Sequence, residues 1–190
     1  MEKSNNNMLG IMGCALLYAV TSFACAFLGF LSPWCWIVVF PVLAAVLGAP
    51  SYLWAARRWQ RFGLGTLFAL VLAVILLVMG EIDFTQTLLM VVVGLISDVV
   101  RQSIGATYKR SILLAYPVLP LGILVWLMKL WTASEWYYQG AAEEIGADYA
   151  EGLKTLSSPW ALVMVIVLVL VGGYTSIIIT NGVFKSPRLP

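Results

Sequence analysis

The chain has 190 residues, of which 62% are hydrophobic and 11% are charged, and it contains no histidine. Average globular domains carry about 25% charged residues, so this composition is typical of an integral membrane protein. The net charge of +2 provides no basic surface for nucleic acid. Without histidine the chain lacks the commonest metal ligand and general base, so we expect no metal site and no cofactor.

Apolar runs divide the chain into segments long enough to cross a bilayer, which takes roughly 20 residues. Pro33 follows the first run, and Pro50 is expected to kink or end the second. The predicted fold is all-α, a polytopic membrane protein whose single domain, residues 1–190, is a six-transmembrane-helix bundle. The spans are predicted at about 8–31, 33–55, 64–80, 85–100, 112–131 and 160–180, and a long outer loop at 132–158.

Basic residues gather in the links on one side of this topology. Lysine and arginine near span ends stay cytoplasmic, and six spans place both termini on the same side. We therefore expect cytoplasmic termini, with seven of the nine acids on the outer side. The basic residues of the inner side are Lys3, Arg57, Arg58, Arg61, Arg101, Lys109, Arg110, Lys185 and Arg188.

The outer loop, residues 132–158, is the one long polar segment, and it holds five acids and several aromatic residues. We predict that it forms a lid over a small-molecule site. Apolar residues recur in it at helical spacing, so one face of a loop helix is expected to lie against the membrane domain. Glycines at 140, 146 and 152 interrupt that pattern and predict a mobile segment.

Aromatic side chains are abundant near the outer ends of the spans, where they form either an interfacial belt or the walls of a pocket for a flat ligand. Glu81 and Asp83 would add polar contacts from the second outer turn. Lys129 either extends to the interface or contacts an anionic ligand group. The predicted substrate-binding residues are Phe30, Trp34, Trp36, Glu81, Asp83, Trp126, Lys129, Trp131, Trp136, Tyr138 and Tyr149.

Catalytic and ATP-binding motifs are missing from the sequence, so we expect neither an enzyme nor a self-powered pump. Asp98 and Arg101 are three residues apart and are predicted to pair on one helix face. Ala15 and Ala19 stand four apart in the first span. Small residues at this spacing let helices approach closely, either within the bundle or at a docking face for another membrane protein.

In length, span number and several local motifs the chain resembles the S components of energy-coupling factor (ECF) transporters, and more narrowly the Trep-Strep group. Val183 stands where that group tends to have histidine. The resemblance rests on Ala15-x-x-x-Ala19, the stretch Ile96-Ser97-Asp98-Val99-Val100-Arg101, the aromatic acidic loop from Trp136-Tyr137-Tyr138 to Tyr149-Ala150, and the tail Phe184-Lys185.

This resemblance implies a subunit that binds a vitamin-like micronutrient from outside, with tetrapyrroles among the candidates. Its partners would be a transmembrane T protein, docked through Ala15 and Ala19, and two cytoplasmic ATPases. The S component would deliver its cargo by toppling in the bilayer. Nickel and cobalt are not expected, because metal-specific relatives use an N-terminal histidine. The alternative is a stand-alone secondary transporter or channel, which needs a polar path that the span centres lack.

Overall fold

The computed structural model describes residues 2–105 and 109–184, with side chains described from residue 8 onward in these ranges. All regular elements in the described ranges are helices, most of them α-helices. In chain order they are α1 (Glu2–Ala26), η1 (Phe27–Leu31), η2 (Cys35–Val39), α2 (Phe40–Leu47), α3 (Ala49–Arg58), α4 (Leu64–Val78), α5 (Phe84–Ile104), α6 (Lys109–Ala115), η3 (Tyr116–Val118), α7 (Leu121–Trp126), α8 (Lys129–Thr132), α9 (Ser134–Glu144), α10 (Ala147–Leu156) and α11 (Pro159–Val183).

Five helical stretches among the described residues are long and apolar enough to cross a membrane, and each overlaps a predicted span. The remaining predicted span, 64–80, corresponds to α4, which has 15 residues. A helix of that length rises only about 22 Å, less than the roughly 30 Å of a bilayer core. The five stretches are Met8–Leu31, Cys35–Arg58, Phe84–Ile104, Lys109–Trp126 and Pro159–Val183.

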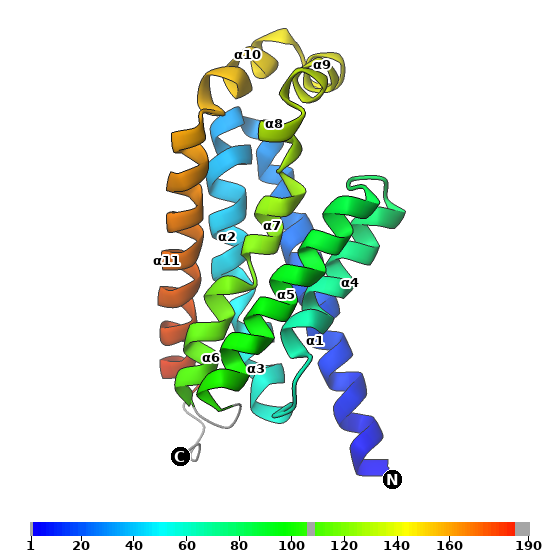
Figure 1. Cartoon of the computed structure of the whole chain (residues 1–190), viewed down its shortest axis with the longest axis vertical. Helices are drawn as coiled ribbons and strands as arrows, with labels where there is room; N and C mark the ends of the chain where they lie inside the picture. Colours follow the sequence, from blue (N-terminus) through cyan, green and yellow to red (C-terminus); the bar gives the residue numbers. More distant parts are fainter. Residues whose placement is uncertain (1, 106–108, 185–190) are drawn as a thin grey trace.

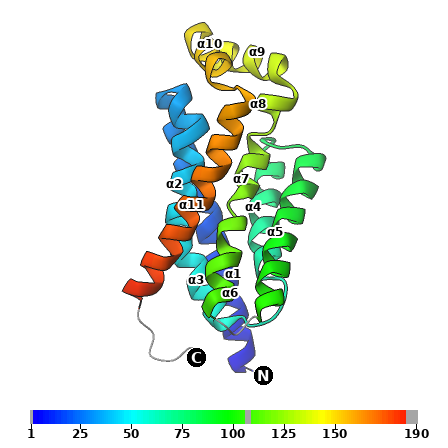
Figure 2. The same ribbon diagram turned by 60° about the vertical axis from the view of Figure 1, so that its left-hand side comes forward.

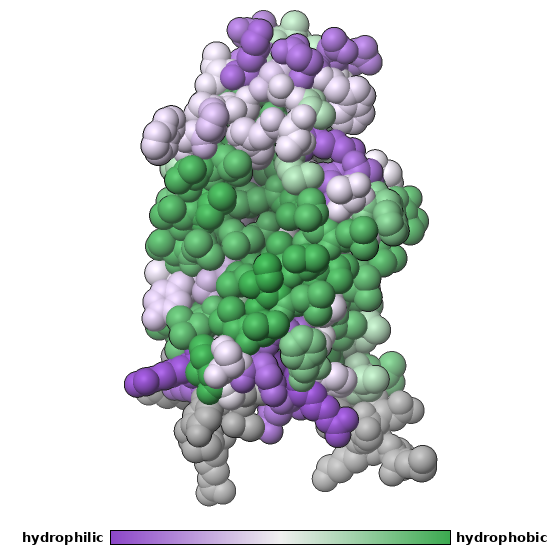
Figure 3. Space-filling model, viewed as in Figure 1, coloured by the Kyte–Doolittle hydropathy of each residue, from purple (hydrophilic) through white to green (hydrophobic). Residues whose placement is uncertain are grey.

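The long helices run lengthwise beside one another, and α9 and α10 lie across one end of the bundle (Figure 1). Helix α1 begins, and α11 ends, at the opposite end. Seen from a second direction, the hairpin between α4 and α5 stops short of the level of α9 and α10 (Figure 2). On the face shown in Figure 3, hydrophobic residues form a broad band across the middle and hydrophilic residues gather at both ends, as expected for a protein embedded in a bilayer.

Pro50 interrupts the second membrane stretch, as predicted, and other helices compensate for the interruption. Helix α2 ends at Leu47 and α3 begins at Ala49. Because Pro50 has no N–H, the carbonyl of Val46 lacks its usual partner four residues later. The hydroxyl of Ser176 on α11 donates to this carbonyl at 2.6 Å. A break in one helix is thereby converted into a contact between two helices.

Asp98 and Arg101 bind helix ends rather than forming the predicted pair. Asp98 accepts hydrogen bonds from the backbone N–H groups of Gly65 and Thr66, at 2.7 and 2.8 Å, in the first turn of α4. Arg101 donates to the carbonyls of Ala56 and Trp59, at 2.9 and 2.5 Å, at the end of α3. Helix termini leave such groups without intrahelical partners. Both side chains therefore stabilise the link between α3 and α4.

The small residues of the first span pack inside the bundle. The side chains of Ala15 and Ala19 are 0% and 1% exposed and belong to the main hydrophobic core. A partner protein cannot contact them while the bundle is closed, so the predicted docking face is not a surface of this structure. Close packing between helices also explains Gly65 and Gly94, because a Cβ on Gly94 would lie 2.8 Å from the carbonyl oxygen of Gly65.

The segment predicted as a long loop forms a cap of two helices, and the break between them falls at one of the three glycines predicted to interrupt it. Helices α9 and α10 are separated at Gly146, whose φ of 139° is a conformation that residues with a side chain rarely adopt. Gly140 and Gly152, also predicted to interrupt the segment, lie within α9 and α10. We call residues 134–156 the cap.

Candidate functional site

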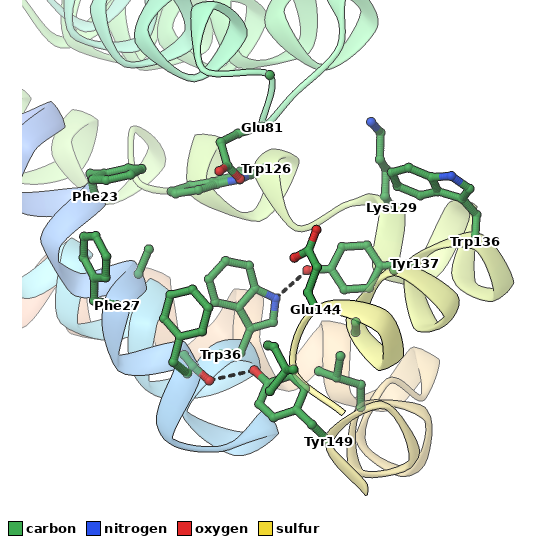
Figure 4. A pocket seen from close by; sticks show the side chains of 18 residues that line it. Phe23, Phe27, Trp36, Glu81, Trp126, Lys129, Trp136, Tyr137, Glu144 and Tyr149 are labelled. Atoms are coloured by element: carbon green, nitrogen blue, oxygen red, sulfur yellow. Dashed lines mark hydrogen bonds between the residues drawn. The ribbon is translucent and has the colours of Figure 1, made fainter. Parts of the chain in front are cut away.

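A cavity of about 470 Å³ lies beneath the cap, between the C-terminal ends of α1 and α7 and the α4–α5 hairpin (Figure 4). A volume of this size is in the range that takes a small organic ligand. It is lined by Phe23, Ala26, Phe27, Gly29, Phe30, Trp36, Gly80, Glu81, Trp126, Lys129, Trp136, Tyr137, Gly140, Ala141, Glu144, Ile145, Tyr149 and Leu153.

Aromatic rings from three separate segments form the inner wall of the cavity. Trp126 of α7 lies parallel to Phe23 of α1, with ring centroids 6.2 Å apart, and edge-on to Trp36, at 6.0 Å. Phe27 packs edge-on against Phe23 at 5.4 Å. Such contacts hold large rings in defined orientations. The wall therefore presents fixed apolar surfaces to the cavity.

Trp36 reaches the cavity because of two local features of the chain. It lies in η2, a short π-helical turn that follows Pro33, and π turns are frequent at functional sites. Its ring packs on Gly29, where an added Cβ would lie 2.2 Å from Cε3 of the indole. Glycine at position 29 is therefore required for the tryptophan to adopt this position.

Two tyrosine hydroxyls connect the cap to the body. Tyr137 of α9 accepts a hydrogen bond from Nε1 of Trp36 at 2.6 Å, and Tyr149 of α10 donates to the carbonyl of Gly29 at 2.6 Å (Figure 4). Gly152 lets α10 approach the first outer turn, since a Cβ there would lie 2.7 Å from Cγ of Pro33. The cap is thus attached to the residues that shape the cavity.

The tyrosines of these contacts are held in their neutral form. Burial raises the pKa of Tyr149 to about 12. Burial also raises the pKa of Tyr137; the hydrogen bond from Trp36 opposes this shift, and the charges of Tyr149, Glu81 and Glu144 add to it. The nearby carboxylates of Glu81 and Glu144 thus favour the neutral form of the Tyr137 hydroxyl.

Lys129 is held at the edge of the cavity by two contacts. Its ammonium lies 3.4 Å from the Asp83 carboxylate and 5.2 Å from the centre of the Trp136 ring. The pKa of Asp83 is lowered, chiefly by the backbone N–H of Gln86 and further by Lys129. The ammonium points away from Tyr137 and Glu144 (Figure 4). Lys129 thus balances a carboxylate of the chain itself.

Gln86 joins the hairpin to the helix that carries Trp126. Its side chain is 0% exposed and forms a capping box with Asp83 at the start of α5. Its amide also donates to the carbonyls of Val125 and Trp126 at 2.9 and 3.0 Å. This one buried amide therefore fixes the hairpin, and with it Glu81, relative to the aromatic wall.

Seven of the eleven predicted substrate-binding residues line this cavity: Phe30, Trp36, Glu81, Trp126, Lys129, Trp136 and Tyr149. The other four are not among its lining residues. Trp34 is 48% exposed, and Asp83 binds Lys129. Trp131 donates from Nε1 to the carbonyl of Ser158 at 3.3 Å, and the Tyr138 hydroxyl pairs with that of Ser157.

Some lining residues were missed, although the sequence contained a signal for several of them. Phe23, Ala26 and Phe27 precede the predicted Phe30 at spacings of seven, four and three, which place all four on one face of a helix. Tyr137 lies in the sequence between Trp136 and Tyr138, which were both predicted to bind substrate. Nothing in the sequence distinguishes Glu144 from Glu143 next to it, which is also exposed but does not line the cavity.

Residues 8–186 match the model of a family described as hypothetical bacterial integral membrane protein (Trep_Strep). No curated protein and no solved structure matches the chain. The family match covers nearly all of the chain, agrees with the membrane-spanning helices, and confirms the narrower resemblance drawn from the sequence. The chain therefore belongs to the Trep_Strep family of bacterial integral membrane proteins, and it is a multi-pass protein of the plasma membrane.

Proposed function

We propose that this chain is the substrate-binding S component of an ECF-type importer and that its cavity binds a small organic micronutrient from outside. The observation that carries the proposal is the ring-lined cavity of about 470 Å³ beneath the cap. Its size, its aromatic wall and its few polar groups are those of a small-molecule site. The resemblance to S components supplies the transport role.

The proposal includes a topology of six crossings with α4 as the short third span. Arg57 and Arg58 end α3 and Arg101 lies in the last turn of α5, whereas the cap carries an excess of acids. Basic residues remain in the cytoplasm, so this distribution favours an outward-facing cap and cytoplasmic termini. The predicted positions of Lys3, Lys185 and Arg188 lie outside the described side chains.

A separate transmembrane T protein and two ATPases would supply the energy. The chain has no ATP-binding motif of its own, which favours a division of labour of this kind. Because Ala15 and Ala19 are buried, they are not part of this proposal, and the T protein would contact other residues. Release of the cargo would require the cap to separate from the first outer turn.

Binding by the pure protein in nanodiscs, measured against vitamins, nucleobases and porphyrins, tests the site. We expect at least one ligand of micromolar affinity or better. Replacing Trp136 by alanine should weaken the binding of that ligand about tenfold, because a ring that covers the ligand is lost. Trp160→Ala is the matched control, since this ring is 80% exposed at the start of α11, away from the cavity.

The transport role is tested in liposomes. Uptake should require the T protein and both ATPases and should stop when ATP is omitted. Uptake by this chain alone would instead support a stand-alone carrier or channel. Failure of every panel compound to bind the pure protein would contradict the proposed site itself.

A further inference from the structure

The cavity has a surplus of negative charge that the chain does not neutralise. Its charged lining residues are Glu81, Glu144 and Lys129. In the part of the chain that the structure describes, the only ion pair joins Lys129 to Asp83. The two glutamates are therefore left without a cationic partner there; both are exposed to solvent, and both line the space next to the aromatic wall.

The two glutamates come from different elements and lie on different sides of the space. Glu81 belongs to the α4–α5 hairpin, and its carboxylate lies next to Trp126 (Figure 4). Glu144 is the last residue of α9, and its carboxylate points to the centre of the cavity beside Tyr137 (Figure 4). Both line the same cavity as Tyr137.

The position of Glu144 is unfavourable for the helix that carries it. A helix ends in a partial negative charge, so cations are favoured in its last turn and acids are not. The last turn of α9 contains Glu143 and Glu144 and no basic residue. A positive charge bound next to Glu144 would relieve this repulsion and would stabilise the cap in its closed position.

The aromatic wall is also suited to bind a positive charge. Ring faces attract cations, most strongly tryptophan, and the attraction grows as water is excluded. The chain already shows such a contact at the edge of the cavity, where the Lys129 ammonium lies 5.2 Å from the Trp136 ring centre. The described residues gather no set of three or more metal ligands, so an organic cation fits better than a metal ion.

We infer that the cavity selects a flat organic cation, whose rings lie against the aromatic wall and whose positive charge is balanced by Glu81 and Glu144. This inference rests on the proposed function and names its class of substrate. Exposed acids on the cap, Glu135, Glu143, Asp148 and Glu151, extend the negative field outward. Such a field attracts cations to the cavity and is screened by salt.

Three probes of similar outline test the inference on the full chain in nanodiscs, with binding read from tryptophan fluorescence. N-methylquinolinium is a permanent flat cation, methylnaphthalene is its uncharged isostere, and naphthoate is an anion. We expect the cation to bind at least about tenfold more tightly than the other two at low salt, with the difference shrinking as salt is added.

Glutamine substitutions identify the groups responsible. Glu81→Gln and Glu144→Gln should each weaken the cation about three- to fivefold, as for partly exposed charge pairs, and leave methylnaphthalene unchanged. Glu143→Gln is the matched control, because it removes an adjacent acid of the same helix that does not line the cavity. Its effect should be less than about twofold.

The outcomes separate this inference from the proposed function. Equal or tighter binding of methylnaphthalene, of naphthoate or of an uncharged vitamin would overturn the preference for a cation and leave the binding site standing. The same holds if the cation binds but neither glutamine variant weakens it. If no probe and no panel compound binds, the proposed function is overturned together with the inference.

Discussion

Nε1 of Trp36 donates a hydrogen bond to the Tyr137 hydroxyl at 2.6 Å, and this contact joins residues 101 positions apart. Trp36 belongs to the first outer turn and Tyr137 to the cap, and both line the cavity. A single hydrogen bond therefore couples the closed position of α9 to the orientation of a ring in the aromatic wall. Loosening the cap should also change the surface offered to a ligand.

Tyr137→Phe removes this hydrogen bond and keeps the ring. A hydrogen bond of this kind contributes about 1 kcal/mol, so we expect a bound ligand to dissociate about fivefold faster. Stopped-flow dissociation measures the effect. Tyr138→Phe is the control, because the Tyr138 hydroxyl pairs with Ser157 outside the cavity. Equal acceleration in both variants would show that the contact with Trp36 does not control release.

Alkaline pH should weaken the attachment of the cap. The pKa of Tyr149 is raised to about 12 in the folded chain, against about 10 in an unfolded one. A raised pKa means that the contribution is complete below about pH 10 and is lost as the pH rises through about 12. The free energy of unfolding should fall across this window, and less steeply in Tyr149→Phe. Identical slopes in the two proteins would contradict the assignment.

Ala15→Leu should destabilise the bundle itself. The side chain at this position is 0% exposed, and adding three carbons to a filled core typically costs about 1–3 kcal/mol. Unfolding in a detergent titration measures the loss, and ligand binding should decline with it. Leu17→Ala, on the 57% exposed face of the same helix, is the control. A stable, ligand-binding Ala15→Leu variant that loses only partner assembly would instead support the docking face.

Asp98→Asn should loosen the start of α4. Asp98 is 2% exposed and accepts hydrogen bonds from two backbone N–H groups and from the Thr66 hydroxyl. The amide keeps one oxygen and turns a donor toward groups that also donate, which costs about 2–3 kcal/mol. Detergent unfolding again provides the measurement, with the exposed Glu151→Gln as reference. A change no larger than in Glu151→Gln would rule out the capping role.

The membrane-spanning helices were predictable because hydropathy and length alone identify them. The interruption at Pro50 and the break at Gly146 followed from the backbone chemistry of proline and glycine. The partners of Asp98 and Arg101 were not predictable, because the ends of α3 and α4 that they bind lie more than 30 positions away along the chain. Local spacing suggested a pair within one helix, whereas the helix termini offered stronger partners.

Part of the cavity was predictable from the aromatic composition of the outer ends, which indicated Trp36, Trp126 and Trp136. The burial of Ala15 was not predictable, because small residues at this spacing serve packing within a bundle and docking between proteins equally well. The position of Glu144 in the cavity lining was also not predictable from the sequence. It depends on where α9 ends and on the direction in which the cap crosses the bundle.

The short α4 has a consequence for the lipid around the protein. It has only 15 residues, and the hairpin between α4 and α5, which carries Glu81, stops short of the level of α9 and α10 (Figure 2). In the proposed topology of six crossings, acyl chains next to this hairpin would shorten or tilt, and that adjustment costs more in a thick bilayer than in a thin one. Bilayer thickness would then act directly on the side wall of the cavity.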